Sequence, residues 1–274
     1  MNKPMEDLLT SFTLDTLLLF LLLGGVVGVI AGLFGVGGGL IIVPALIWGL
    51  PLMGVIPEHS THIAVGTSLA TIVVTSLAAI RAHQRRGAVL WREVGLLTPG
   101  ILLGAWLGGI LAGALGGDIL QRVYGVFAIL VALHLIFYAP EKRHNFTLGP
   151  WPMGMSGGLI GLVSAVVGIG GGSMTVPLLH ATGVEMRKAV ATSSACGLPI
   201  ALSGTLSFIF TGWALEGLPA GSSGYVYWPV ALIIVVTSTL FAPLGASLAH
   251  RLPARQLKRG FALFLFCVGV SLLF

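Results

Sequence analysis

Apolar runs of about 18 residues or more recur along the whole chain, and short polar segments separate them. Runs of that length cross a bilayer as helices. The pattern predicts spans over residues 14–34, 63–80, 94–115, a run ending at 138, 153–167, 189–210, 226–249 and a last run reaching 274, with two shorter segments over 40–50 and 173–182. Glu58, His59 and His62 are expected in a polar loop, and Arg251, Arg255, Lys258 and Arg259 in a basic loop.

Composition agrees with this pattern. The chain has 274 residues, of which 56% are hydrophobic and 8% are charged, whereas an ordinary globular domain has roughly 25% charged residues. The sequence therefore predicts an all-α polytopic membrane protein. The net charge of +5 comes from basic residues in the short loops, so it indicates membrane orientation rather than a nucleic-acid partner.

Two glycine clusters interrupt apolar runs that would otherwise continue as helices. Glycine inside a helix is unfavourable by roughly 1 kcal/mol relative to alanine, so three consecutive glycines predict a helix break. The clusters comprise Gly35, Gly37, Gly38 and Gly39 in the first copy and Gly168, Gly170, Gly171 and Gly172 in the second. Each last glycine is followed five residues later by a proline, Pro44 or Pro177. Breaks at matching points of two halves indicate a transporter binding site.

The two halves match beyond the glycines. Residues 64–68 (AVGTS) match residues 189–193 (AVATS), and Leu120-Gln121-Arg122 matches Leu257-Lys258-Arg259. We therefore predict a first transmembrane repeat over residues 1–138, a linker over 139–150 and a second repeat over 151–274.

The basic residues predict how the repeats are oriented. If the basic loop 81–92 is cytoplasmic, the Asp118 turn and the charge-poor loop 211–225 lie outside, and loop 251–259 lies inside. The charge bias then flips between corresponding loops, as in two inverted repeats of five segments each, with both termini extracytoplasmic. A different count of the short segments would give a parallel repeat. Whether these segments cross the membrane fully or are re-entrant is left open by the sequence.

The glycine breaks are the first candidate site. A half-helix that begins at a break directs free N–H groups and the positive end of its dipole into the membrane interior, where an anion is the preferred ligand. The alternative is that the glycines only allow close helix packing. A nucleotide-binding loop is excluded, because no Gly-Lys-Ser/Thr follows the first cluster.

Hydroxyl side chains provide the second set of candidates. Thr67 and Ser68 match Thr192 and Ser193, early in the helix that follows each short segment. They are predicted to donate to anion oxygens, although such hydroxyls also bond the carbonyl one turn back or join helices. No Asp or Glu lies at the centre of a span, which weakens a cation-transport hypothesis and leaves the coupling ion open. Cys196 and Cys267 lie in apolar segments and indicate neither a disulfide framework nor a metal site, and no cofactor is expected.

These motifs resemble the sulfite exporter TauE/SafE family. The resemblance rests on the two glycine clusters with their Val-Pro pairs, on Thr67-Ser68 and Ala191-Thr192-Ser193, on Gly245-Ala246, and on the loop His83–Val89 leading into Trp91. It implies a bacterial or archaeal inner-membrane permease that exports small sulfur-containing anions such as sulfite or organosulfonates. We predict a secondary transporter of such an anion, held between the two breaks in the lipid bilayer.

Three alternatives remain open at this point. The same cavity can serve a passive anion channel, or a permease for another small anion. A membrane enzyme is disfavoured, because no cluster of nucleophile, base and metal ligands lies at membrane depth. The exact anion, the direction of transport, the coupling ion and the oligomeric state do not follow from the sequence.

Overall fold

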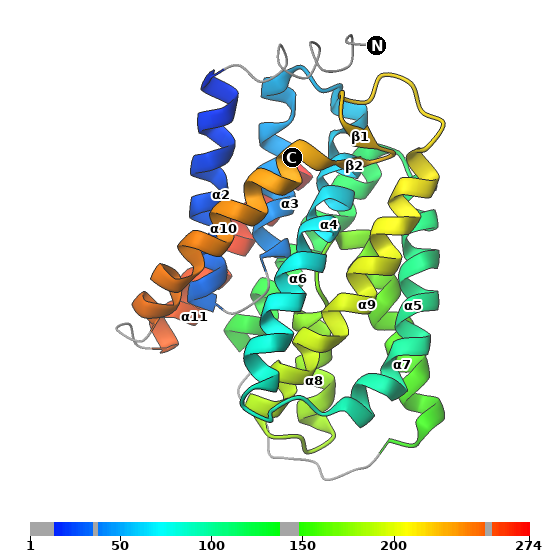
Figure 1. Ribbon diagram of the computed structural model, residues 1–274, viewed down its shortest axis with the longest axis vertical. Coiled ribbons are helices and arrows are strands. Elements are labelled where there is room, and N and C mark those ends of the chain that lie inside the picture. The colour runs from blue at the N-terminus through cyan, green and yellow to red at the C-terminus, as the bar shows by residue number, and fades with distance from the viewer. Residues whose placement is uncertain (1–13, 35–37, 138–147, 250–253) are drawn as a thin grey trace.

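The fold is a bundle of helices of very different length, shown in Figure 1. A computed structural model describes residues 14–34, 38–137, 148–249 and 254–274. Its helices are α2 (Leu14–Phe34), α3 (Gly39–Gly49), α4 (Pro57–Gln84), α5 (Trp91–Ala114), α6 (Gly117–Phe137), α7 (Pro150–Val167), α8 (Gly172–Ala181), α9 (Met186–Gly212), α10 (Trp228–Ala249) and α11 (Ala254–Leu273). A 3-10 turn η1 (Pro51–Met53) and the two-residue strands β1 (Ser222–Ser223) and β2 (Val226–Tyr227) complete the described elements.

The prediction of an all-α polytopic membrane protein is confirmed. Within the described residues, six helices are long and apolar enough to cross a membrane, namely α4, α5, α6, α7, α9 and α10. The predicted helix breaks are also present, because α2 and α3 are separate helices and so are α7 and α8. The antiparallel pairing of β1 with β2 is confined to the α9–α10 connection.

Predicted loops are wrong where charged residues continue a helix. Of the basic loop predicted over 81–92, Arg81 and His83 lie in the last turn of α4 and Arg92 lies in α5. Glu58, His59 and His62 belong to the first turns of α4. Pro57 can start a helix without losing a hydrogen bond, and an acidic residue in the first turn suits the helix dipole. Arg255, Lys258 and Arg259 likewise lie in α11, since Arg and Lys are good helix formers. Charge marked the end of the apolar run but not the end of the helix.

Each of the main helix pairs joins one helix from residues 1–137 to one from residues 148–274. Helix α5 packs along α7, and α2 packs along α10, with each pair running parallel. Glycines make the α5–α7 contact close: a Cβ atom on Gly100 or Gly104 would collide with the backbone of Gly154 or Gly158. Helix α4 packs antiparallel to α9 at the centre of the bundle, and α6 packs antiparallel to α11.

The bundle has two distinct ends. The hairpin end, at the top of Figure 1, carries β1 and β2, the start of α4 and the α5–α6 turn, where Gly117 packs on Glu58. The basic end, at the bottom, carries the α4–α5 loop with Arg85 and Arg86 and the α8–α9 turn. The α4–α5 loop and α9 meet there through a hydrogen bond from Leu90 N to Thr192 Oγ1 of 3.0 Å.

Candidate functional site: the two glycine breaks

Left-handed glycines start both short helices. Gly38 has φ 76° and Gly171 has φ 72°, and each is the residue directly before α3 or α8. A side chain is strained in this conformation, which explains why glycine stands at both positions. Gly168, with φ 75°, ends α7 in the same way. Gly35 and Gly37 of the predicted site lie outside the described residues.

The two breaks touch each other in the interior of the bundle. A Cβ atom on Gly39 would lie only 2.7 Å from the Gly168 carbonyl oxygen and 3.0 Å from Ile169 Cα. Ser68 Oγ donates a hydrogen bond of 2.8 Å to the same Gly168 oxygen. Ser68 therefore ties α4 to the end of α7, at the point where the two glycine clusters meet.

Proline frees one carbonyl group in each short helix. Pro44 has no N–H, so the carbonyl of Leu40, one turn earlier, has no helical donor. The hydroxyl of Tyr124, on α6, is buried and donates to this oxygen at 2.8 Å. Pro177 frees the carbonyl of Ser173 in the same way. The position aligned with Tyr124 in the second half is Phe261, which has no hydroxyl.

The first break is closed and apolar. Residues from Gly38 to Pro44 are buried, and the side chains in the first turn of α3 are those of Leu40, Ile41 and Ile42. Ile72 of α4 packs against Gly39, with its Cδ1 atom 3.1 Å from a Cβ atom built there. The hydroxyl groups that reach this break, those of Ser68 and Tyr124, already donate to the carbonyls of Gly168 and Leu40.

The second break is partly open and lined by hydroxyl groups. Gly170, Gly172 and Ser173 are partly exposed. Among the described residues, Ser164 Oγ, Ser173 Oγ and Thr175 Oγ1 are buried without a hydrogen-bond partner. Ser164 lies in the last turn of α7, and the other two lie in the first turn of α8. Buried polar atoms are almost always paired, so this group of unpaired hydroxyls needs an explanation such as bound water or a ligand.

The start of α8 also leaves its first backbone N–H groups without a helical acceptor. No side chain caps α8, and the first N–H groups with a helical acceptor are those of Met174 and Thr175, which donate to the Gly171 oxygen. The N–H groups of Gly172 and Ser173 precede them in the open turn. Ser193 Oγ of α9 lies 3.6 Å from a Cβ atom built on Gly172. The described residues that the glycines of this break contact are uncharged, so the α8 dipole supplies the positive potential.

Sequence reasoning named Ser193 and the glycines of this break but missed Ser164, Ser173 and Thr175. A signal was present in the comparison of the halves, because Ser173 and Thr175 stand where the first copy has Leu40 and Ile42. The predicted site was built from residues that the two halves share, whereas Ser173 and Thr175 occupy positions at which the halves differ.

The two predicted threonines have backbone partners instead of an open cavity. Thr67 Oγ1 accepts a 3.0 Å hydrogen bond from Tyr227 N, and Thr192 Oγ1 accepts one of 3.0 Å from Leu90 N. Both threonines are fully buried. Leu90 and Tyr227 occupy equivalent places, each directly before the tryptophan that starts α5 or α10. Each threonine therefore fixes the residue directly before a helix of the opposite half. Contact of either hydroxyl with an anion stays a prediction.

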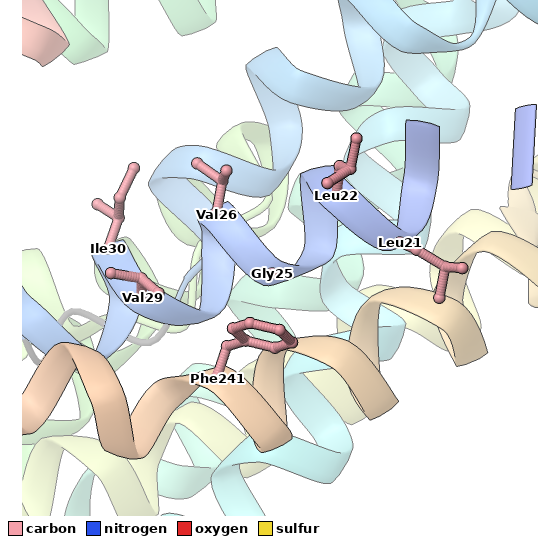
Figure 2. A pocket seen from close by; sticks show the side chains of 7 residues that line it. All are labelled: Leu21, Leu22, Gly25, Val26, Val29, Ile30 and Phe241. Atoms are coloured by element: carbon pink, nitrogen blue, oxygen red, sulfur yellow. The ribbon is translucent and has the colours of Figure 1, made fainter. Parts of the chain in front are cut away.

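A groove between α2 and α10 is unsuited to an anion. It has a volume of about 310 Å³ and is lined by apolar residues of α2, from Leu21 to Ile30, together with Phe241 of α10. Figure 2 shows these aliphatic side chains and the Phe241 ring around Gly25. The lining supplies no hydrogen-bond donor, so the groove suits apolar contacts such as lipid chains.

Comparison with known proteins identifies the family. Residues 20–272 match the family described as sulfite exporter TauE/SafE. The chain belongs to the TauE/SafE family. The match covers both glycine breaks and all the helices that surround them.

Relatives of this TauE/SafE protein are transporters by name. A "probable membrane transporter protein" of Haemophilus influenzae is 38% identical over 257 residues, which cover 93% of this chain and 97% of the relative. One from Xylella fastidiosa is 30% identical over 94% of this chain and 95% of the relative. One from Methanocaldococcus jannaschii is 25% identical over 93% and 94%. No solved structure matches the chain. The TauE/SafE protein is thus a multi-pass membrane transporter.

Proposed function

We propose that this protein is a secondary transporter that exports a small sulfur-containing anion, such as sulfite or an organosulfonate, and binds it at the second glycine break. The observation that carries the proposal is the set of unpaired buried hydroxyls of Ser164, Ser173 and Thr175 beside the uncapped start of α8. A helix N-terminus with hydroxyl donors is a favourable site for oxyanions. The family resemblance supports sulfur oxyanions as the class.

The absence of a cationic side chain among the described neighbours of the break suits transport. A lysine or arginine at membrane depth would bind an anion tightly and would be costly to desolvate when the anion leaves. Backbone N–H and hydroxyl donors bind more weakly. We propose that Gly170, Gly171 and Gly172 provide the backbone surface and that Ser193 contributes from α9, because its hydroxyl lies beside Gly172. The first break and Thr67, Ser68 and Thr192 complete the proposed site around it.

We further propose that the two halves, residues 1–138 and 151–274 with a linker over 139–150, are inverted repeats that exchange roles during alternating access. The helix directions support this proposal. A two-fold axis in the membrane plane places equivalent helices antiparallel, as α4 with α9 and α6 with α11. It also pairs the first helix of each half with the fourth of the other, as α2 with α10 and α7 with α5.

The basic end supports an orientation. It gathers Arg85 and Arg86 with the start of α9, which carries Arg187 and Lys188. By the positive-inside rule we propose that this end faces the cytoplasm of a bacterial or archaeal inner membrane. The start of α2, where Phe20 packs near Gly49, and the end of α11, where Leu272 accepts from Gln121, lie at the opposite end. Both termini are then extracytoplasmic.

The test is flux of labelled sulfite into proteoliposomes that contain the purified protein, with unlabelled sulfoacetate, sulfate and chloride as competitors. We expect saturable flux that sulfoacetate blocks. Gly171→Val is expected to abolish it, because φ at this position is 72° and the new side chain meets Ile200. Gly38→Val is expected to do the same at the first break.

Gly54→Val is the matched control. Gly54 has a similar φ of 78°, but a Cβ atom there meets nothing within 4 Å, so the backbone strain is reproduced away from the site. Retained sulfite flux in both Gly171→Val and Gly38→Val would refute the site. Fast flux that does not saturate would identify a channel, and absence of flux for every sulfur anion would refute the substrate class.

A further inference from the structure

One face of α4 passes across both glycine breaks. Ser68, Ile72 and Ser76 lie four residues apart on this helix, so their side chains share that face. Ser68 donates to the Gly168 oxygen at 2.8 Å. Ile72 lies one turn further along, with its Cγ2 atom 3.2 Å from a Cβ atom built on Gly170. Ser76 follows one turn beyond Ile72, toward the basic end, and is the next side chain of this face.

Ser76 meets the second break at Gly197 of α9. A Cβ atom built on Gly197 would lie 2.9 Å from the Gly170 oxygen and 3.0 Å from Ser76 Oγ. The α4 hydroxyl and the break therefore lie against the same point of α9, which runs beside α4 through the centre of the bundle (Figure 1). Ser193 lies one turn before Gly197 on this face of α9, with its Oγ beside Gly172. Ser76 thus faces the break from the other half of the chain.

The hydroxyl group of Ser76 has no hydrogen-bond partner among the described residues, although the side chain is only 7% exposed. A serine in a helix commonly donates to the carbonyl one turn back. Its neighbour Thr75 does donate to its own helix, at the Ile72 oxygen. Buried hydroxyls without a partner are rare, so Ser76 needs the same explanation as the unpaired hydroxyls of the second break.

The unpaired hydroxyls around the second break come from different helices. Ser164 belongs to α7, Ser173 and Thr175 belong to α8, and Ser193 belongs to α9. Ser76 adds a donor from α4, across the break from these groups. An oxyanion has several oxygen atoms, which accept charge-assisted hydrogen bonds from different directions at once. A ligand of this class can therefore use donors from both halves of the chain.

Comparison of the two halves sets Ser76 apart from the duplicated framework. The alignment of residues 64–68 with residues 189–193 places Ala201 opposite Ser76. Ser173 and Thr175 likewise stand opposite aliphatic residues of the first copy. These three hydroxyls all lie beside the second break, and each replaces an apolar side chain of the other half. Their shared location fits a common ligand better than a common role in packing the two halves.

We propose that Ser76 is a binding residue for the transported anion, and that its hydroxyl donates from α4 to an anion held at the start of α8. The inference rests on the proposed function and extends it, because the bound anion then connects the two halves of the chain across the second break. Binding of the anion gives the Ser76 hydroxyl the hydrogen-bond partner that the empty site lacks.

Thermal unfolding of the purified protein tests this role without any transport. A ligand that binds only the folded protein raises the melting temperature once its concentration exceeds Kd. The probes are sulfite and methanesulfonate, with gluconate keeping the ionic strength constant. Ser76→Ala removes no hydrogen bond among the described residues, so the melting temperature without anion should equal that of the parent. The sulfite concentration that gives the same rise should increase about 10- to 100-fold, as for loss of one hydrogen bond to a charged group.

Ser194→Ala is the matched control. Ser194 lies on α9 next to Ser193, but its hydroxyl donates to the Val190 oxygen of its own helix at 3.0 Å. The dependence of its melting temperature on sulfite should therefore follow that of the parent. Thr175→Val is the positive control, because the proposed function places this hydroxyl at the anion, and it should weaken sulfite binding to a similar extent.

The outcomes separate this inference from the proposed function. Unchanged sulfite dependence in Ser76→Ala, together with weakened binding in Thr175→Val, would overturn the role of Ser76 and leave the second break as the site. An equal loss of affinity in Ser76→Ala and Ser194→Ala would also overturn it, because the effect would not depend on the free hydroxyl. If neither anion raised the melting temperature of the parent, the proposed function itself would be refuted.

Discussion

The two glycine breaks share a backbone and differ in what surrounds it. Both place a left-handed glycine before a short helix and a proline in that helix, which frees a carbonyl group. At the first break this oxygen receives the Tyr124 hydroxyl and the first turn is apolar and buried. At the second break, hydroxyl groups stand without partners and the turn is partly exposed.

The two breaks therefore have the same backbone geometry but different side-chain chemistry. A pair of identical sites would compete for one anion or hold two. Of the two breaks, the second is the one where buried hydroxyl donors of described residues are unpaired. Substitutions at matching positions of the two breaks test this difference.

Alanine substitutions at the matching glycines Gly39 and Gly172 are expected to give the largest difference in stability between the two breaks. Gly39→Ala places a Cβ atom 2.7 Å from the Gly168 oxygen, where only backbone can move. We expect it to lower the free energy of unfolding by about 3 kcal/mol. Gly172→Ala meets nothing closer than Ser193 Oγ at 3.6 Å and is expected to stay within about 0.5 kcal/mol. Denaturant unfolding in detergent measures both, and equal losses would contradict the view that only the first break is closed.

Exchanging hydroxyl and aliphatic groups tests where the anion binds. Thr175→Val removes an unpaired hydroxyl, so stability should not fall. The apparent affinity for sulfite should drop by about 10- to 100-fold, because a hydrogen bond to a charged group contributes about 1.5–3 kcal/mol. Ile42→Thr adds a hydroxyl at the matching buried position. It should cost about 1–3 kcal/mol of stability and leave the affinity unchanged. Concentration-dependent flux of labelled sulfite distinguishes the two, and an unaltered affinity in Thr175→Val would argue against the second break.

Removing one hydroxyl tests the closure of the first break. Tyr124→Phe leaves the Leu40 carbonyl buried without a donor, and we expect about 1–2 kcal/mol of destabilisation. Tyr225→Phe is the control, because no hydrogen bond from its hydroxyl is present among the described residues. Thermal unfolding followed by size-exclusion chromatography compares them. Similar melting temperatures for both variants would show that the Pro44-freed carbonyl finds water instead.

Matching threonines should give the smallest effects. Thr67→Val and Thr192→Val each remove the acceptor for one backbone N–H, and we expect a loss of about 0.6–1 kcal/mol for each, as for other hydrogen bonds between membrane helices. Denaturation and sulfite flux are measured on the same samples. If Thr192→Val instead blocks sulfite flux without lowering stability, the result would favour anion binding by this hydroxyl over a purely structural role at the start of α5.

Much of the architecture followed from local pattern. The long apolar runs determined the spans, because backbone groups in lipid must be satisfied within a helix. Gly38 and Gly171 determined the breaks, because only glycine adopts their left-handed conformation without strain. Predicted helix boundaries were wrong where a helix continues through charged residues, as at Glu58 and Lys258. Charged residues indicate where the chain leaves the membrane, but they do not end the backbone hydrogen bonding of the helix.

The tertiary structure alone decided which polar groups are used and which are left unpaired. Thr67 and its donor Tyr227 lie 160 residues apart, and Thr192 and Leu90 lie 102 apart, so no local pattern could reveal that these hydroxyls are engaged. Likewise Tyr124 lies 84 residues from the carbonyl it satisfies. Sequence determined where the helices break, because that is a property of a few neighbouring residues. Packing decided which break is closed and which is left with free donors, because that depends on the side chains that other helices bring to it.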